Sequence, residues 1–206
     1  MRLSPKSLLI ACVTAIAAIP AHAATVSKSY SYYSISGDTL DELQEQLLTR
    51  GPHVNATGQK HPGATQMEFT TRLGYTEGTR ECRVAKATVT LEARIILPRW
   101  RKPAGAAQEV RMVWETLSAD IKRHEESHVG IARNHARELE QALRAIAPAK
   151  TCALAASEAE EITASILKKH DEAQARFDRI ELVNFERRFM RLMDYRLQRT
   201  KKEAAE

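Results

Sequence analysis

The sequence lacks the features that mark several large classes of protein. Three cysteines among 206 residues are too few for a small domain built on disulfides, and only 5% of the residues are aromatic. No apolar run is long enough to stay in a membrane as a span, while a hydrophobic content of 43% is too high for a disordered chain. The net charge of +5 is mild, and Lys and Arg are interspersed with Glu, so we expect no nucleic-acid partner. The chain also has no Gly-rich phosphate loop and no exposed-Ser elbow motif. What remains is one domain of ordinary size, or one domain with an appendage.

Residues 1–23 have the pattern of a secretory signal peptide. Arg2 and Lys6 precede the apolar run 8–19, and a small-x-small cleavage site ends at Ala23. We therefore expect cleavage after Ala23, a periplasmic or secreted mature protein, and no transmembrane segment after signal removal. The alternative is a lipid anchor on Cys12, since residues 9–12 look like a lipobox, but few apolar residues would then precede the cysteine.

Export changes how the remaining cysteines are interpreted. Once the signal is removed, only Cys82 and Cys152 are left, and a single pair in an oxidising compartment usually forms a disulfide. Such a bridge closes a long loop and would stabilise the fold by about 3–5 kcal/mol in the chain-entropy model. The alternative is a pair of buried free thiols.

The part of the mature chain from 24 to 105 carries strand and turn signals. Apolar residues alternate with polar and charged ones from Ala85 to Leu97, which predicts a strand with one apolar face that Pro98 should end. Asp38 or Thr39 can cap a short helix. In chain order, we expect a strand at 30–35, a helix at 39–48, a polar loop at 53–64, and strands at 67–75 and 84–97.

The part from 106 to 201 changes to a helical period. Apolar residues recur every three or four positions, Pro148 interrupts the pattern, and a second helix is expected from near Ser157, with glutamates in its first turn. A short loop between two long helices predicts an antiparallel hairpin. The basic end of the second helix, at 187–202, is expected to be a solvated face. Together, residues 24–206 are expected to form a single domain.

A metal-binding motif interrupts the apolar pattern of the first helix. Residues 124–128 read His-Glu-Glu-Ser-His, which is the pattern H-E-x-x-H. Four residues turn a helix by about 400°, so His124 and His128 lie on one face and can hold one Zn²⁺. Glu125 is then placed to act as the general base that takes a proton from the attacking water. The alternative is a pair of histidines that are simply hydrogen-bonded to their neighbours.

A zinc site of this type needs a third protein ligand. His135 lies on the same helix face, but a rise of about 1.5 Å per residue puts it roughly 10 Å beyond His128. If the second helix folds back near residues 151–152, His128 faces about residue 175 and His124 about residue 179. Asp178 is therefore our first candidate and His170, which should lie nearer His135, is the second.

A set of short motifs is spread along the mature chain. In chain order they are Tyr33-x-Ile35-x-Gly37-x-Thr39, Glu42-Leu43, Gly51-Pro52, Gly63-Ala64-Thr65, Cys82, Leu97-Pro98-x-Trp100, Trp114, the 124–128 motif, Cys152 and Phe177-Asp178. With these motifs the chain resembles a bacterial family of unknown function that is described as predicted secreted zinc-dependent proteases.

The resemblance implies zinc binding through His124 and His128, a base at Glu125 and a bridge between Cys82 and Cys152. The chain departs from the family at one place. The family's Tyr-Asp pair is often followed by Thr-x-His-Gly, and Glu181, Val183 and Asn184 stand at those positions here.

These observations predict an α+β, zincin-like domain, in which a small antiparallel sheet packs against a long HExxH helix and a second long helix antiparallel to it. The expected function is a periplasmic zinc endopeptidase acting on a peptide or protein substrate, with the strand at 84–97 aligning the substrate by analogy with known zincins. The alternative is a catalytically silent periplasmic binding or scaffolding module built on the helical hairpin. The sequence does not predict the oligomeric state.

Overall fold

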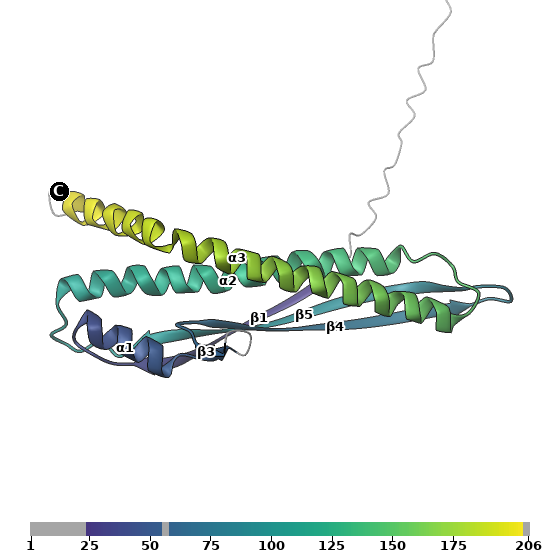
Figure 1. Ribbon diagram of the computed structural model, residues 1–206, viewed down its shortest axis with the longest axis horizontal. Coiled ribbons are helices and arrows are strands. Elements are labelled where there is room, and N and C mark those ends of the chain that lie inside the picture. Colours follow the sequence, from purple (N-terminus) through teal and green to yellow (C-terminus); the bar gives the residue numbers. More distant parts are fainter. Residues whose placement is uncertain (1–23, 55–57, 204–206) are drawn as a thin grey trace, which may run out of the picture.

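The protein folds as two long helices lying along an elongated sheet. The computed structural model describes residues 24–54 and 58–203, so the expected signal at 1–23 and the alternative lipid anchor at Cys12 lie outside the described residues. The helices α2 (Gln108–Arg144) and α3 (Cys152–Glu203) run antiparallel over one face of a three-stranded sheet (Figure 1). This is the α+β arrangement and the helical hairpin that the sequence predicts. Among the described helices, none is both long and apolar enough to cross a lipid bilayer.

The sheet is mixed, which corrects the expectation of an antiparallel sheet. Its strands are β1 (Thr25–Ile35), β4 (Ala64–Glu77) and β5 (Cys82–Trp100), in the order β1-β5-β4. The strands β4 and β5 form an antiparallel hairpin, whereas β1 pairs with β5 in parallel. Alternating residues identify a strand but not its direction. The chain reverses once after β1, where α1 (Leu40–Arg50) lies, and again in the β4–β5 hairpin, so β1 and β5 run the same way.

Pro98 lies inside β5 rather than ending it. The β4 pairing stops at Ile96, while β1 continues beside β5 as far as Trp100. The N–H of Arg101 donates to Ile35 of β1, so by the alternation of a strand the nitrogen of Pro98 faces the other edge. At that edge β4 has already ended, and a residue without an N–H is tolerated there.

The remaining short elements follow the sequence closely. Thr39 caps α1 in a capping box with Glu42, as its sequence suggests. The expected polar loop at 53–64 contains a pair of two-residue strands, β2 (His53–Val54) and β3 (Gln59–Lys60).

The helix α3 begins one turn earlier than expected, at Cys152 rather than near Ser157. The reason is that the hydroxyl of Thr151 accepts a hydrogen bond from the N–H of Leu154. The expected glutamates therefore lie beyond the first turn.

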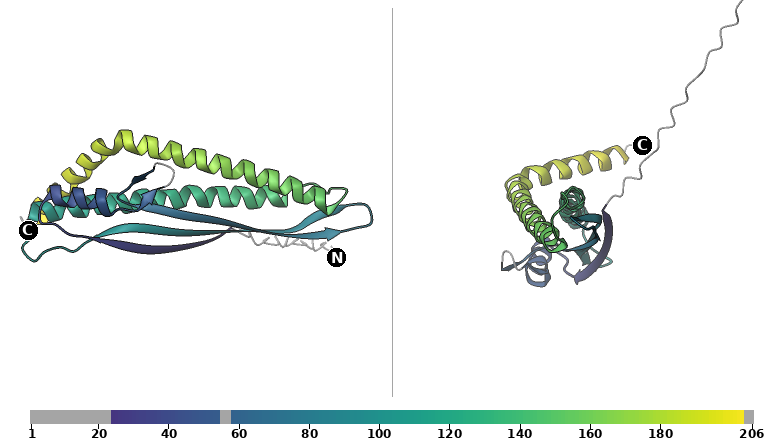
Figure 2. Two further views of the ribbon diagram at one scale, coloured as in Figure 1. Left: turned by 60° about the horizontal axis from the view of Figure 1, so that its bottom comes forward. Right: turned by 90° about the vertical axis from the view of Figure 1, so that its right-hand side faces the viewer.

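The core lies between the sheet and the two helices (Figure 2). The apolar face of β5 packs against α2 and α3, and many of the helix residues at the contact are alanines, which let the elements approach closely. Under the middle of α2, Ile121 and Val129 pack on Ile95 and Leu97 of β5. The HExxH turn is therefore held directly over the central strand.

The Cys82–Cys152 disulfide is present, as predicted. It joins the first residue of β5 to the first residue of α3, and paired backbone hydrogen bonds between Cys82 and Ala149 lie beside it. The loop of the helical hairpin is thus attached to the sheet, which restrains sliding of α3 along α2. A disulfide is also typical of proteins that leave the cytoplasm.

Candidate metal centre

The two histidines of the HExxH motif lie side by side on the face of α2 that meets α3. Their Nε2 atoms are 3.1 Å apart. The ring of Phe177 packs 5.1 Å, centroid to centroid, from each of the two imidazole rings. The histidines are thus held by packing as well as by helix spacing, with both Nε2 atoms directed to one point.

Asp178 of α3 brings a carboxylate to the same point. Its Oδ1 lies 3.1 Å from Nε2 of His128 and 3.4 Å from Nε2 of His124. Burial by itself would raise the pKa of Asp178, but hydrogen bonds from His124 and His128 outweigh it and hold that pKa well below its usual range. The pKa of His128 is raised, because its bonds to Asp178 and Gln174 outweigh the opposing effect of burial.

The chemistry of this donor set fits a zinc ion. One ligand atom from each of His124, His128 and Asp178 lies within 4.8 Å of the other two, so the group could hold a metal ion. Two nitrogens bound to one tetrahedral zinc would be about 3.3 Å apart, close to the separation of the two imidazoles. The side chain of Asp178 is 53% exposed, which leaves solvent access for a further ligand.

In the helical hairpin, Asp178 and not His170 lies beside His124 and His128. His170 instead packs against His135, with ring centroids 5.6 Å apart, as the helix register predicts. Gln174 lies between His170 and Asp178 along α3 and contacts His128. Sequence reasoning missed Gln174, although the register already indicated residue 175 as the one facing His128.

Glu125 is turned toward the sheet rather than toward Asp178. It is 5% exposed, and the hydroxyl of Thr65 in β4 donates to its Oε2 over 2.8 Å. Burial raises the pKa of Glu125, and the bond from Thr65 opposes that rise. Gly63 provides the space for this carboxylate, since a Cβ atom there would be 2.7 Å from Oε1. The Gly63-Ala64-Thr65 motif was the sequence signal for this contact.

A buried ion network lies one turn from His124. Asp120 is 4% exposed and accepts hydrogen bonds from Arg123 of α2 and from Arg188 of α3. Arg188 and Arg123 also pair with Glu181, whose Oε2 is 3.6 Å from Nδ1 of His124. Arg188 therefore does not belong to the solvated basic face that the sequence suggests, because it compensates a buried carboxylate.

Residues 30–184 match the model of a bacterial protein family of unknown function, DUF922. The chain belongs to this family. The matched range contains the HExxH motif, Asp178 and both bridged cysteines. No curated protein and no solved structure matches the chain.

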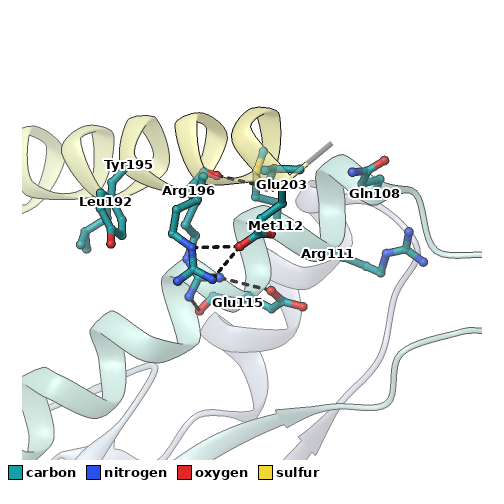
Figure 3. A pocket seen from close by; sticks show the side chains of 10 residues that line it. Gln108, Arg111, Met112, Glu115, Leu192, Tyr195, Arg196 and Glu203 are labelled. Carbon is teal, nitrogen blue, oxygen red and sulfur yellow. Dashed lines mark hydrogen bonds and ion pairs between the residues drawn. The ribbon is translucent and has the colours of Figure 1, made fainter. Parts of the chain in front are cut away.

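This DUF922 chain also has a groove away from the metal-binding group. It has a volume of about 480 Å³ and lies between the first turns of α2 and the last turns of α3 (Figure 3). Arg196 pairs with Glu115 across it. Its α3 residues, from Leu192 onward, lie beyond the range that matches the family. The groove is therefore a separate feature from the histidine pair.

Proposed function

We propose that this protein is an exported zinc-dependent peptidase, with His124, His128 and Asp178 as the protein ligands of the ion. The observation that carries the proposal is the convergence of these three side chains from two helices. Three protein ligands with one open position are the arrangement of catalytic rather than structural zinc sites. Bound zinc supplies Lewis-acid polarisation of the scissile carbonyl and lowers the pKa of water.

In this proposal Glu125 is the general base. It follows His124 directly in the helix, so its carboxylate lies between the histidine pair and β4. A turn of its side chain away from Thr65 would bring the carboxylate toward the water that attacks the peptide. Thr65 and Gly63 then act on the reaction by positioning that side chain.

The substrate we propose is a peptide in extended conformation beside β4. The earlier expectation that the 84–97 strand aligns the substrate is wrong, because β5 is the central strand and both of its edges are paired. By contrast, β4 pairs with β5 along one edge only, and its other edge has no strand partner among the described residues. Thr65, at the start of β4, contacts Glu125, so this edge leads to the proposed site.

The test separates metal binding from hydrolysis. Glu125→Gln should keep zinc and lose hydrolysis, because an amide cannot accept the proton of water. His124→Ala should lose the metal. A screen of periplasmic peptides cleaved by the parent and not by Glu125→Gln would identify substrates. If Glu125→Gln cleaves a substrate at the parent rate, the mechanism is wrong.

The third ligand is tested by a pair of variants. Asp178→Ala should weaken zinc affinity by about 10-fold or more while leaving the helix content intact. His170→Ala should not abolish zinc binding, since the ring of His170 faces His135 rather than the proposed ligands His124 and His128. If His170→Ala loses zinc and Asp178→Ala does not, the assignment moves to His170.

The second candidate is a silent binding or scaffolding module. It is favoured by the apolar residues that the second half of α3 exposes, among them Leu182 at 79% and Val183 at 82%. Such residues are typical of a surface that a partner covers. The zinc content of the gently purified mature chain decides between the candidates, since a chain without stoichiometric metal supports the module.

A further inference from the structure

Gln174 of α3 joins His128, which is partly buried, to the buried His170. It lies between His128 on α2 and His170, one turn earlier on α3. Its Oε1 is 2.7 Å from Nδ1 of His128, and its Nε2 is 2.8 Å from Nε2 of His170. A third contact, from its Nε2 to the backbone carbonyl of His128, measures 3.1 Å.

The third contact determines how the amide is oriented. A backbone carbonyl only accepts hydrogen bonds, so the atom of Gln174 that faces it must be the NH₂ group. The other end of the amide is then the oxygen, which also only accepts. Nδ1 of His128 must therefore carry the hydrogen and donate it to Gln174.

The contacts of His170 agree with this orientation from the other side. Its Nδ1 lies 2.9 Å from the carboxylate of Asp171, which accepts, so Nδ1 carries the hydrogen and Nε2 has a free lone pair. That lone pair accepts the second N–H of Gln174. The ring of His170 is buried and packs against Phe69 of β4, with centroids 5.1 Å apart. The amide of Gln174 is thus held by a ring that has little freedom to turn.

We propose that Gln174, anchored by His170, is a positioning residue that fixes His128 as the Nδ1–H tautomer and leaves Nε2 as the metal-binding atom. This rests on the proposed zinc site and deepens it. The other histidine is held differently, since Nδ1 of His124 faces Glu181 at 3.6 Å, beyond hydrogen-bond distance. Groups that orient a metal-bound histidine through its second nitrogen typically contribute about 10–100-fold to metal affinity.

The experiment compares zinc affinity, by competition with a chromophoric chelator, in the full mature chain and three variants. Gln174→Leu removes the acceptor and should weaken affinity about 10-fold. Gln174→Glu keeps an acceptor for Nδ1 of His128 but loses the N–H groups that donate to His170 and to the His128 carbonyl, so its zinc affinity should fall between those of the parent and Gln174→Leu. Glu172→Leu, an exposed change on the same helix, is the control and should bind as the parent does.

A second readout reports the hydrogen bond itself. In the zinc-loaded parent, ¹H–¹⁵N spectra of the histidine rings should show the Nδ1–H of His128 protected from exchange with water. Gln174→Glu should keep this protection and Gln174→Leu should lose it. A residue that merely filled space between the helices would leave the signal unchanged in all variants.

The outcomes separate the two proposals. If the parent itself does not bind zinc, the proposed function fails. If the parent binds zinc but Gln174→Leu matches Glu172→Leu in affinity, the inference about Gln174 is overturned and the metal site stands. Should Gln174→Leu fail to fold, Gln174→Glu decides alone, because that variant keeps the acceptor, and loss of the protected Nδ1–H signal in it would overturn the inference.

Discussion

Arg188→Ala tests whether α3 is held to α2 by a buried ion pair. The guanidinium of Arg188 donates from Nε to Oδ1 of Asp120 over 3.0 Å and from a terminal nitrogen to Oδ2 over 3.1 Å. It also pairs with Glu181. The substitution removes all of these contacts and leaves the buried carboxylate of Asp120 with Arg123 of α2 as its remaining partner among the described residues.

The expected loss in the free energy of unfolding depends on how well the Asp120 carboxylate is still compensated in the variant. Removing one partner of a buried ion pair costs about 3–5 kcal/mol, because the other charge loses its compensation. Arg123 still donates to Asp120, so we expect the free energy of unfolding to fall by about 2–3 kcal/mol. The matched control is Arg196→Ala, which breaks a solvent-accessible pair with Glu115 and should cost less than about 1 kcal/mol.

The assay is urea unfolding followed by far-ultraviolet circular dichroism, with the disulfide intact and a chelator present so that no metal contributes. The double variant Asp120→Asn/Arg188→Ala should recover part of the loss, because the uncompensated charge is gone. If Arg188→Ala and Arg196→Ala change the free energy of unfolding equally, the buried network does not hold the helices as argued.

Three further predictions concern the packing around the site and the sheet. Gly63→Ala should destabilise by about 1–3 kcal/mol, since its methyl group would meet the Glu125 carboxylate, and urea unfolding should show a smaller loss when Glu125 is also changed to Ala. Glu140→Ala should cost about 1–3 kcal/mol and speed amide exchange at Val89, whose buried N–H donates to Glu140, whereas Glu140→Gln should retain most of that protection. Burial alone would raise the pKa of Asp120, but its bonds to arginine outweigh it and lower that pKa, so the stability it contributes is complete above the unfolded carboxyl pKa of about 3.9 and is lost as the pH falls further. Urea midpoints at about pH 5 and pH 3 should therefore differ less in Asp120→Asn than in the parent, and equal differences would refute this.

Much of the candidate site could be predicted because it depends on local spacing. An i, i+4 pair of histidines lies on one face of a helix in any context. Asp178 could be matched to that pair because a short loop makes the return helix antiparallel, and the rise per residue then determines which positions face each other. The disulfide could be predicted since only two cysteines remain after the expected signal.

The sequence by itself therefore determined the helical hairpin, the histidine pair, the level of Asp178 and the bridged cysteines. Tertiary structure alone decided that β1 runs parallel to β5, that β5 is central, and that Glu125 meets Thr65, because strand direction and edge position depend on how the chain crosses over. It also decided that Arg188 pairs with a buried carboxylate, since a basic run looks the same in sequence whether it faces water or a carboxylate such as Asp120. Periodicity describes one element at a time, and these features arise only where two elements meet.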